Sequence, residues 1–257
     1  MAAARAGIAA VALHIAMGPP AFFVDLLRRV ADFRIGPVID PRPDVWRWPD
    51  EPTDQLVPIR SVAWSDPMAV MPPWLAEPAP GPTAYLTLGT VAFGAVDVLR
   101  RSIQEAAARC ARVLVAAGPE ADLAALGDLP AHVHVERYVD QATVLGQVDV
   151  AIHHGGTGTL LGCLAAGVPQ VITPQGADQF LNADRLGELG LGYAVRNEAA
   201  DGHLGEALER VLTDEQLRSR VRKVRDDIAR MPSPQEVVET LVRLGRPAQD
   251  PFPSGTD

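Results

Sequence analysis

Short apolar runs alternate with helical patterns from residue 83 to residue 245, and this alternation leaves the chain few possible folds. Runs typical of buried strands occupy residues 84–88, 112–116, 132–135, 148–152 and 170–173. Helical apolar spacing covers residues 96–108, 178–189 and 203–244, with a break at 231–234. Strands that are apolar throughout and are separated by helices pair in parallel, because helices then cover both faces of the sheet. The sequence therefore predicts a Rossmann-like α/β domain.

The segment 37–82 has a different character, because it holds twelve of the 23 prolines. Proline lacks a backbone donor and fixes φ, so we expect neither regular helix nor central strand here. The segment is predicted to be a connector. Its four tryptophans, which we expect to pack the connector onto a domain rather than to serve a site, are Trp46, Trp48, Trp64 and Trp74.

The ends of the chain complete the predicted organisation. Residues 7–13 resemble a strand and residues 22–33 an amphipathic helix, so residues 1–36 amount to one βα unit, the remnant of an N-terminal domain. The regular pattern assigns residues 83–245 to the main domain. Residues 246–257 are predicted to be a disordered tail.

Composition and charge narrow the class of protein. The chain has 47% hydrophobic residues, and its 23 lysines and arginines against 32 acids give a net charge of −9. These values favour a globular protein and argue against a nucleic-acid partner. The one basic cluster, 218–225, is predicted to be a solvated helix face. Cys110 and Cys163 lie in apolar runs, so we expect buried thiols, and we expect a cytoplasmic protein without a transmembrane segment.

A glycine-rich segment, residues 153–159, directly follows the predicted strand 148–152 and opens a helical pattern. A strand, a glycine turn and a helix place unpaired N–H groups at a helix N-terminus, which favours an anion. Glycine lets the backbone approach a phosphate closely, and His154 adds an imidazole donor. The segment matches neither the dinucleotide fingerprint nor the P-loop pattern. We infer a pyrophosphate ligand, and we expect His153, at the strand end, to be a packed histidine.

A second group of polar residues follows the strand 170–173. Asp178 and Gln179 come after this strand, and the carboxyl ends of parallel strands meet at one edge of a sheet. A carboxylate beside a carboxamide suits the hydroxyls of a sugar. The alternative for Asp178 is that it only caps the helix that begins there.

Taken together, these segments resemble a known signature. His154-x-Gly156-x-x-Thr159, the stretch 165–169 and residues 176–179 are similar to the donor-binding signature of UDP-glycosyltransferase-like enzymes of the GT-B fold. The bacterial glycosyltransferases of antibiotics and other natural products, of the macrolide type, are the most similar. Residues 87–90 and 137–141 resemble two further family elements. The resemblance covers roughly residues 56–245, and it identifies the C-terminal, donor-binding half of such an enzyme.

The resemblance implies roles for individual residues. The sugar would be held by Asp178 and Gln179. The base and ribose would lie near Tyr138, Val139, Gln141 and Gly162. The diphosphate would be bound by His154, Gly155, Gly156, Thr157, Gly158 and Thr159, with Thr87 and Thr90 in the facing loop. Many family members carry a ribose-binding glutamate where this chain has Gly162, so we expect a dTDP-sugar, with UDP as the alternative.

The resemblance further implies a hexosyltransferase that inverts the anomeric centre and needs no metal or other cofactor. Its acceptor would be a small hydrophobic molecule bearing a hydroxyl. The family's general base is a histidine of the N-terminal domain, and His14 does not fall at that position. No catalytic residue is therefore assigned in this chain.

Several alternatives stay open at this stage. The N-terminal domain is expected from a longer native chain, or from a separate partner chain in a two-chain enzyme. A non-catalytic helper that binds nucleotide sugars is the third possibility, and an epimerase on the same fold is a weaker rival. The last helix should cross back toward the N-terminal domain and expose Val237, Val238 and Leu241, which predicts self-association, for example as a homodimer.

Overall fold

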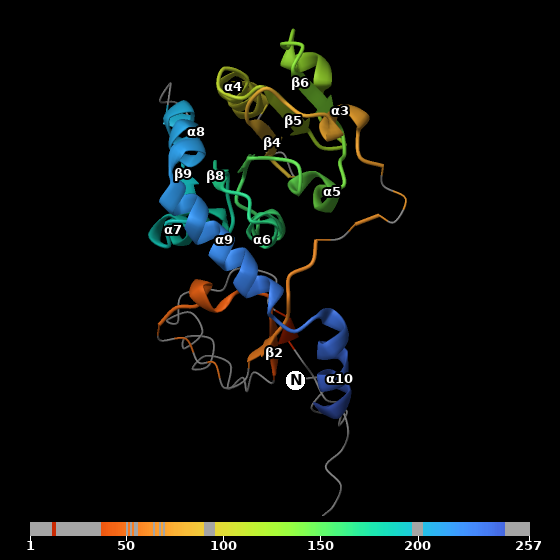
Figure 1. Ribbon diagram of the computed structural model, residues 1–257, viewed down its shortest axis with the longest axis vertical. Helices are drawn as coiled ribbons and strands as arrows, with labels where there is room; N and C mark the ends of the chain where they lie inside the picture. The colour runs from red at the N-terminus through yellow and green to blue at the C-terminus, as the bar shows by residue number, and fades with distance from the viewer. Residues whose placement is uncertain are drawn as a thin grey trace, which may run out of the picture.

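The computed structural model describes residues 12–13, 37–49, 51, 53, 56–63, 65–66, 68, 70–89, 96–196 and 203–244. Most of the predicted remnant 1–36, Thr90 and the predicted tail 246–257 lie outside these ranges. Figure 1 shows the path of the chain, and its labels are used below.

Six parallel strands form the main sheet. They are β4 (Thr83–Thr87), β5 (Arg112–Ala116), β6 (Val133–Glu136), β7 (Val150–His153), β8 (Gln170–Ile172) and β9 (Gly192–Ala194). Their order in the sheet is β6-β5-β4-β7-β8-β9. The chain therefore starts in the middle, runs to one edge, returns and runs to the other edge. This is the doubly wound order in which ligands bind where the direction reverses, here between β4 and β7.

Helices cover both faces of the main sheet, as predicted. They are α3 (Pro73–Ala76), α4 (Val96–Ala107), α5 (Gln141–Leu145), α6 (Thr157–Ala166), α7 (Gln179–Glu188), α8 (His203–Thr213) and α9 (Glu215–Ala229), with a 3-10 turn η2 (Leu123–Leu126). Successive residues of β4 point into different cores: Leu86 joins the large core formed with α4, α8 and α9, and Tyr85 joins a smaller core with α3 and α5. Alternation of side chains along a strand thus gives the sheet two buried faces.

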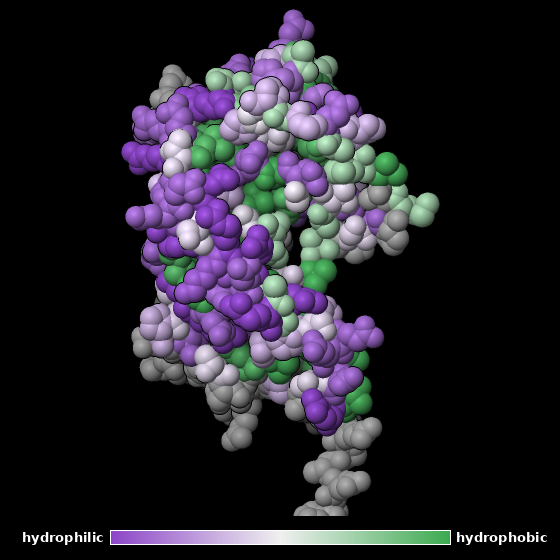
Figure 2. All heavy atoms as spheres, viewed as in Figure 1, coloured by the Kyte–Doolittle hydropathy of each residue, from purple (hydrophilic) through white to green (hydrophobic). Residues whose placement is uncertain are grey.

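Capping residues define several helix ends. Asp140 accepts a hydrogen bond from the N–H of Thr143 (2.9 Å) at the start of α5, and Asp214 accepts one from Leu217 (2.9 Å) at the start of α9. Helix α6 ends at Gly167, whose φ of 74° is the left-handed conformation that suits glycine. The basic cluster lies on α9, where Val221 and Val224 are buried and the charged residues between them are exposed, as predicted. Hydrophilic side chains dominate this side of the molecule (Figure 2).

A second, smaller sheet corrects the prediction for residues 37–82. Strands β1 (Ala12–Leu13), β2 (Val38–Asp40) and β3 (Leu56–Pro58) pair in parallel with β2 in the centre. The expectation of no central strand was wrong because Pro37 and Pro41 flank β2 and Pro58 closes the edge strand β3. No ladder bond in the middle of a strand is therefore lost to proline. The expectation of no helix was wrong at α3 (Pro73–Ala76), a single turn that begins with proline, where a missing N–H costs no helical bond.

The last helix, α10 (Pro234–Leu244), lies beside this small sheet at the end of the molecule away from α4 and β6 (Figure 1). The N–H of Arg60, just after β3, donates to the carbonyl of Pro232 (2.7 Å), so the break before α10 is joined to the small sheet. Val238 is exposed, as predicted, but Val237 is only 3% exposed and Leu241 is half-buried. The prediction that Val237 is exposed was therefore wrong, because this side of α10 is covered by the chain itself.

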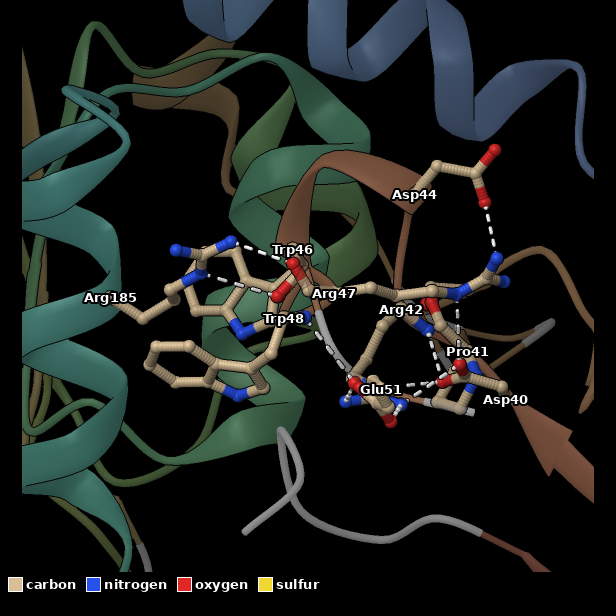
Figure 3. Close-up of polar contacts among 10 residues, drawn as sticks. Asp40, Pro41, Arg42, Asp44, Trp46, Arg47, Trp48, Glu51 and Arg185 are labelled. Carbon is tan, nitrogen blue, oxygen red and sulfur yellow. Dashed lines mark hydrogen bonds and ion pairs between the residues drawn. The ribbon is translucent and has the colours of Figure 1, made fainter. Parts of the chain in front are cut away.

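The loop after β2 joins the two sheets. Its 3-10 turn η1 (Asp44–Trp46) carries Trp46, which is 1% exposed within the core of the main domain. Arg185 of α7 donates to the carbonyls of Trp46 (3.2 Å) and Arg47 (2.8 Å), and its guanidinium lies 4.5 Å from the ring centre of Trp48 (Figure 3). Trp74, in α3, stacks on His134 at 3.8 Å. Tryptophans thus anchor this stretch, as predicted; Trp64 lies outside the described residues.

Buried charges brace the same loop from the other side. Asp40 and Arg42 are both fully buried, and the Arg42 Nε donates to Asp40 Oδ1 at 2.8 Å. Glu51 also pairs with Arg42, and Arg47 bonds to Asp40 (3.3 Å) and Asp44 (2.7 Å) (Figure 3). Each buried charge has a partner, which is the condition under which such charges are tolerated.

Candidate functional site

The glycine turn lies at the reversal point of the main sheet. Strand β7 ends at His153, and α6 begins at Thr157, so residues 154–156 form the turn between them. The loop after β4, which contains Gly89, faces this turn because β4 and β7 are neighbours. The two loops that sequence analysis assigned to the diphosphate, residues 87–89 and 154–159, therefore meet at the ligand-binding crevice of a doubly wound sheet.

The imidazole of His154 is held between two glycines. A Cβ atom at Gly89 would lie 2.8 Å from its Cε1, and one at Gly156 would clash with its Nε2. Its Nδ1 is buried and has no hydrogen-bond partner among the described residues. Burial lowers the pKa of His154, while a hydrogen bond to the backbone of Thr87 and the charge of Asp178 act in the opposite direction. The ring is thus fixed in place beside the glycine turn.

The first turn of α6 supplies backbone donors beside His154. Its N-cap residue Gly156 has no side chain, so no side chain caps the helix. The N–H groups of the first turn have no partner within a helix and are left for a ligand. Thr157 and Thr159 are half-buried and Gly158 is exposed. An anion placed here meets the positive end of the helix dipole.

Asp178 is joined directly to this turn. Its Oδ2 accepts a hydrogen bond from the hydroxyl of Thr157 (3.0 Å). It occupies the N-cap position of α7 but makes no capping hydrogen bond there, so the alternative that it only caps the helix is wrong. Ala177, just before it, has a φ of 52°, an uncommon conformation for a residue other than glycine. The backbone therefore bends sharply to bring Asp178 to the glycine turn.

Gln179 has a different environment from the one expected. Its side chain is 7% exposed, and its Oε1 accepts from the N–H groups of Gln175 (2.7 Å) and Gly176 (3.1 Å). The carboxamide oxygen thus holds the loop that precedes α7. Its predicted role toward a sugar remains a prediction.

The residues predicted for the base and ribose fall into two groups. Gln141 lies beside Gly162, where a Cβ atom would be 3.2 Å from its Oε1. Gln141 and Thr87 both hydrogen-bond the hydroxyl of buried Tyr85, and burial raises the pKa of Tyr85 to about 12. Tyr138, 64% exposed, and Val139 instead border a pocket of about 350 Å³ that is shared with the segment 70–72. Thr90 lies outside the described residues.

His153 is fully buried, as predicted for a packed histidine. Its Nε2 lies 2.8 Å from Oε1 of Gln170, and its Nδ1 accepts from the N–H of Gly155 (3.0 Å). Burial lowers the pKa of His153 to about 3. The ring is therefore neutral at pH 7, with its proton on Nε2.

The two cysteines, Cys110 and Cys163, are buried and free, as predicted.

The lowered pKa of His153 predicts acid sensitivity. The unfolded chain binds this proton near pH 6.5 and the folded chain only near pH 3, so between these values the unfolded state holds more protons. The free energy of unfolding should therefore fall as the pH drops through this window, by up to about 1.4 kcal/mol per pH unit. Urea unfolding between pH 7 and pH 5 measures the slope before most carboxylates titrate.

The control for this prediction is His153→Asn, which removes the titrating ring and keeps an acceptor. The variant should have a shallower slope than the wild type over the same range. His154, whose pKa is also lowered, contributes in the same direction, so some dependence should persist. Equal slopes for the two proteins would contradict the assignment to His153.

Sequence reasoning did not single out Asn182. Its side chain is 1% exposed and donates to the carbonyl of Gly155 (2.8 Å). A buried asparagine on the apolar side of a helix was the available signal, because a buried amide needs a partner.

Within the described ranges, no group of three or more His, Cys, Asp and Glu residues could hold a metal ion. The same ranges contain no helix long and apolar enough to cross a membrane.

Comparison with solved structures defines the class. The glycosyltransferase SnogD of Streptomyces nogalater is similar over 82% of this chain and 57% of its own, with a TM-score of 0.68 and 32% identity. The glycosyltransferase VinC, solved in complex with dTDP, is similar over 81% of this chain and 52% of its own (TM-score 0.69, 26% identity). The main domain is thus the C-terminal domain of the GT-B fold, as predicted.

Comparison with protein families is more specific. Residues 101–244 match the model described as "Erythromycin biosynthesis protein CIII-like, C-terminal domain", and the chain belongs to this family. The L-demethylnoviosyl transferase of Streptomyces niveus is 31% identical over 93% of this chain and 66% of its own length. Across the curated relatives compared, this chain spans 36% to 66% of their lengths. The predicted family is therefore confirmed.

Proposed function

We propose that this chain binds a nucleoside-diphosphate sugar and supplies the donor half of a natural-product glycosyltransferase. The observation that carries the proposal is the position of His154. Its imidazole is fixed between Gly89 and Gly156, at the reversal point of the sheet and beside the uncapped first turn of α6. Relatives of this chain are named as glycosyltransferases, and two solved neighbours, VinC and SpnG, hold thymidine diphosphate.

In the proposed reaction, a hexosyl group passes from the nucleotide to a hydroxyl of a small hydrophobic acceptor, with inversion and without a metal. The charge that develops on the departing diphosphate would be stabilised by His154 and by N–H groups of the first turn of α6, with hydroxyls from Thr157 and Thr159. Donors fixed in advance are effective because they need no rearrangement as the charge develops. Asp178 would accept from hydroxyls of the sugar, with Gln179 beside it.

The base and ribose would lie along Tyr138, Val139, Gln141 and Gly162, with Thr87 and Thr90 toward the diphosphate. Gly162 supports a dTDP donor over UDP because it brings no carboxylate to this position. A Cβ atom there would lie 3.2 Å from Oε1 of Gln141, so Gln141 is the polar side chain beside it. Thymidine lacks the 2′-hydroxyl that such a carboxylate would bind.

The general base is not assigned to a residue of this chain. The acceptor half would come from a longer native chain or from a partner chain, and Val238 on α10 is one exposed apolar residue that such a partner would cover. The second candidate function is a nucleotide-sugar-binding protein without transfer activity, which the donor site alone would also support.

Thermal unfolding with nucleotides tests the donor class. We expect dTDP at 100 times its Kd to add about 2.7 kcal/mol to the free energy of unfolding, or about 5–10 °C in Tm for a domain of this size. At the same concentration, UDP should raise the Tm by less than dTDP does, and GDP should raise it least. A shift for UDP equal to that for dTDP would contradict the dTDP preference, and no shift with any nucleotide would contradict the donor site itself.

A further inference from the structure

Both polar groups of Gly155 are held by buried side chains from other elements. Its N–H donates to Nδ1 of His153 (3.0 Å), and its carbonyl accepts from Nδ2 of Asn182 (2.8 Å). His153 is 0% exposed and Asn182 is 1% exposed. Gly155 has a φ of 90°, a conformation that glycine adopts freely and other residues do not. The turn that leads into α6 is therefore fixed by hydrogen bonds rather than by the preference of its own backbone.

The histidine is itself oriented by the neighbouring strand. Because Nδ1 accepts a hydrogen bond, it carries no proton, and the proton of the neutral ring is on Nε2. That nitrogen faces Oε1 of Gln170, a fully buried residue of β8, at 2.8 Å. The acceptor for Gly155 is thus held at a set angle by two adjacent strands of the sheet.

The asparagine connects the turn to α7. Besides the Gly155 carbonyl, Asn182 Nδ2 lies 3.3 Å from Asp178 Oδ2, which accepts the hydroxyl of Thr157 at 3.0 Å. Asn182 Nδ2 is also 3.4 Å from the Thr157 hydroxyl. One buried amide therefore touches the turn, the first residue of α6 and the proposed sugar residue. Because Asn182 is buried and its amide is used by these contacts, its side chain does not touch a bound donor.

We propose that His153 and Asn182 are positioning residues, which hold the Gly155 peptide so that the first turn of α6 and His154 face the diphosphate. The inference rests on the proposed donor site and adds residues that do not touch the donor. Without either side chain, the glycine-rich turn gains conformations in which the N–H groups point elsewhere. A preorganised anion site binds tightly because its donors need no rearrangement. When the turn becomes more mobile, the affinity for the anion falls and the reaction steps that depend on these donors become slower. Groups that bind the nucleoside should be unaffected.

The test compares a ligand that has the diphosphate with one that lacks it. The affinities of dTDP, by calorimetry, and of thymidine, by NMR titration, are measured for the full chain and for His153→Leu and Asn182→Leu. We expect each variant to bind dTDP about 10-fold more weakly, the value of one lost hydrogen bond near an anion, and thymidine within about twofold. His153→Asn, which keeps an acceptor near the Gly155 N–H, should recover most of the affinity for dTDP.

The matched control is His132→Leu. His132 makes one hydrogen bond to the backbone, to the carbonyl of Ala107 (3.0 Å), and this bond lies away from the glycine turn. It should leave dTDP affinity unchanged. If a leucine variant shows no cooperative melting, Asn182→Ala or His153→Ala, which also lack the hydrogen-bonding group, is measured in its place.

Three outcomes would overturn the inference. The first is unchanged dTDP affinity in folded variants, and the second is an equal loss for dTDP and thymidine. The third is a His153→Asn variant as weak as His153→Leu. Failure of the donor site itself is distinguishable from all three, because the wild-type chain would then not bind dTDP.

Discussion

Replacing His154 with alanine is expected to weaken dTDP binding by about 10- to 150-fold, which corresponds to the 1.5–3 kcal/mol of a hydrogen bond to a charged group. The ring is the most constrained part of the candidate site, because Gly89 and Gly156 enclose it and its Nδ1 is buried without a described partner. Alanine removes the donor and leaves a gap beside Gly89 and Gly156, which have no side chains to fill it.

Transfer should suffer more than binding does. The charge on the diphosphate grows as the sugar departs, so a donor at this position stabilises the transition state more than the ground state. Wherever transfer by the complete enzyme is measurable, kcat should fall by about 100- to 1000-fold, as for loss of one donor to a developing oxyanion. Calorimetry and single-turnover kinetics with a dTDP-sugar measure the two effects separately.

The control for this prediction is His203→Ala. His203 begins α8, is exposed, and lies far along the chain from the turn. Its removal should change neither affinity nor rate. A His154→Ala variant that binds dTDP as tightly as the His203→Ala variant would remove the basis of the proposed function.

Replacing Gly155 with alanine should damage both the fold and the site. Its φ of 90° disfavours any side chain, and a Cβ atom there would lie 2.7 Å from Cγ2 of Ile172, inside the core. A left-handed backbone costs about 1–2 kcal/mol and overpacking a further 1–3 kcal/mol, so we expect a total loss of about 2–5 kcal/mol in the free energy of unfolding. Urea unfolding at pH 7 measures this loss, and dTDP binding should be lost along with the shape of the turn.

Gly158 is the matched control in the same segment. It lies in the first turn of α6, and a Cβ atom there would meet no described atom within 4 Å. Gly158→Ala should therefore leave stability unchanged or raise it by about 0.5–1 kcal/mol, since alanine is the better helix former. If the alanine variants at 155 and 158 unfold at the same urea concentration, the described conformation of the turn is wrong.

The main sheet was predictable because its strands are short, apolar and separated by helices, and this pattern depends on local sequence alone. The predicted strand at residues 112–116 matches β5 residue for residue, and the ends of the other predicted strands differ by one or two residues at most. Strand β9, helix α5 and the break between α8 and α9 at Asp214 were not predicted. Strand order was not predictable in the same way. The reversal between β4 and β7 depends on which side of the sheet each helix packs, which no single segment encodes.

Proline was a poorer guide in the segment 37–82. Its effect depends on the position of each ring relative to a strand, and composition counts only how many there are. Pro37 and Pro41 stand on either side of β2, so that strand keeps all of its donors. Val237 was misjudged for a related reason: the small sheet and α10 lie together, and the pairing of distant segments determines which face of the helix is covered.

The candidate site was predictable where chemistry is concentrated in a motif. His154, the glycines and Asp178 lie together as the motif implied, and contacts between Thr157 and Asp178 join its two halves. The buried residues that hold the motif in place were not predictable from the sequence in this way. Asn182 acts from the buried side of α7, and Gln170 from inside β8, so each looks like an ordinary residue of its element until the partner is known.

The contacts of Trp46 and Arg185, which attach the loop after β2 to the main domain, have a consequence for chimeras made from halves of related enzymes. Trp46 fills the core of the main domain, and Arg185 of α7 holds the carbonyls of the same loop. The proline-rich stretch after residue 48 looks like a natural place for a crossover between two parent enzymes. A crossover there, however, would combine the Trp46 of one parent with the main-domain core of the other. A crossover upstream of Val38 keeps Trp46, the core around it and the buried ion pairs of Asp40 and Arg42 from one parent. Strands β2 and β3, with the loop between them, are then inherited together with the main domain.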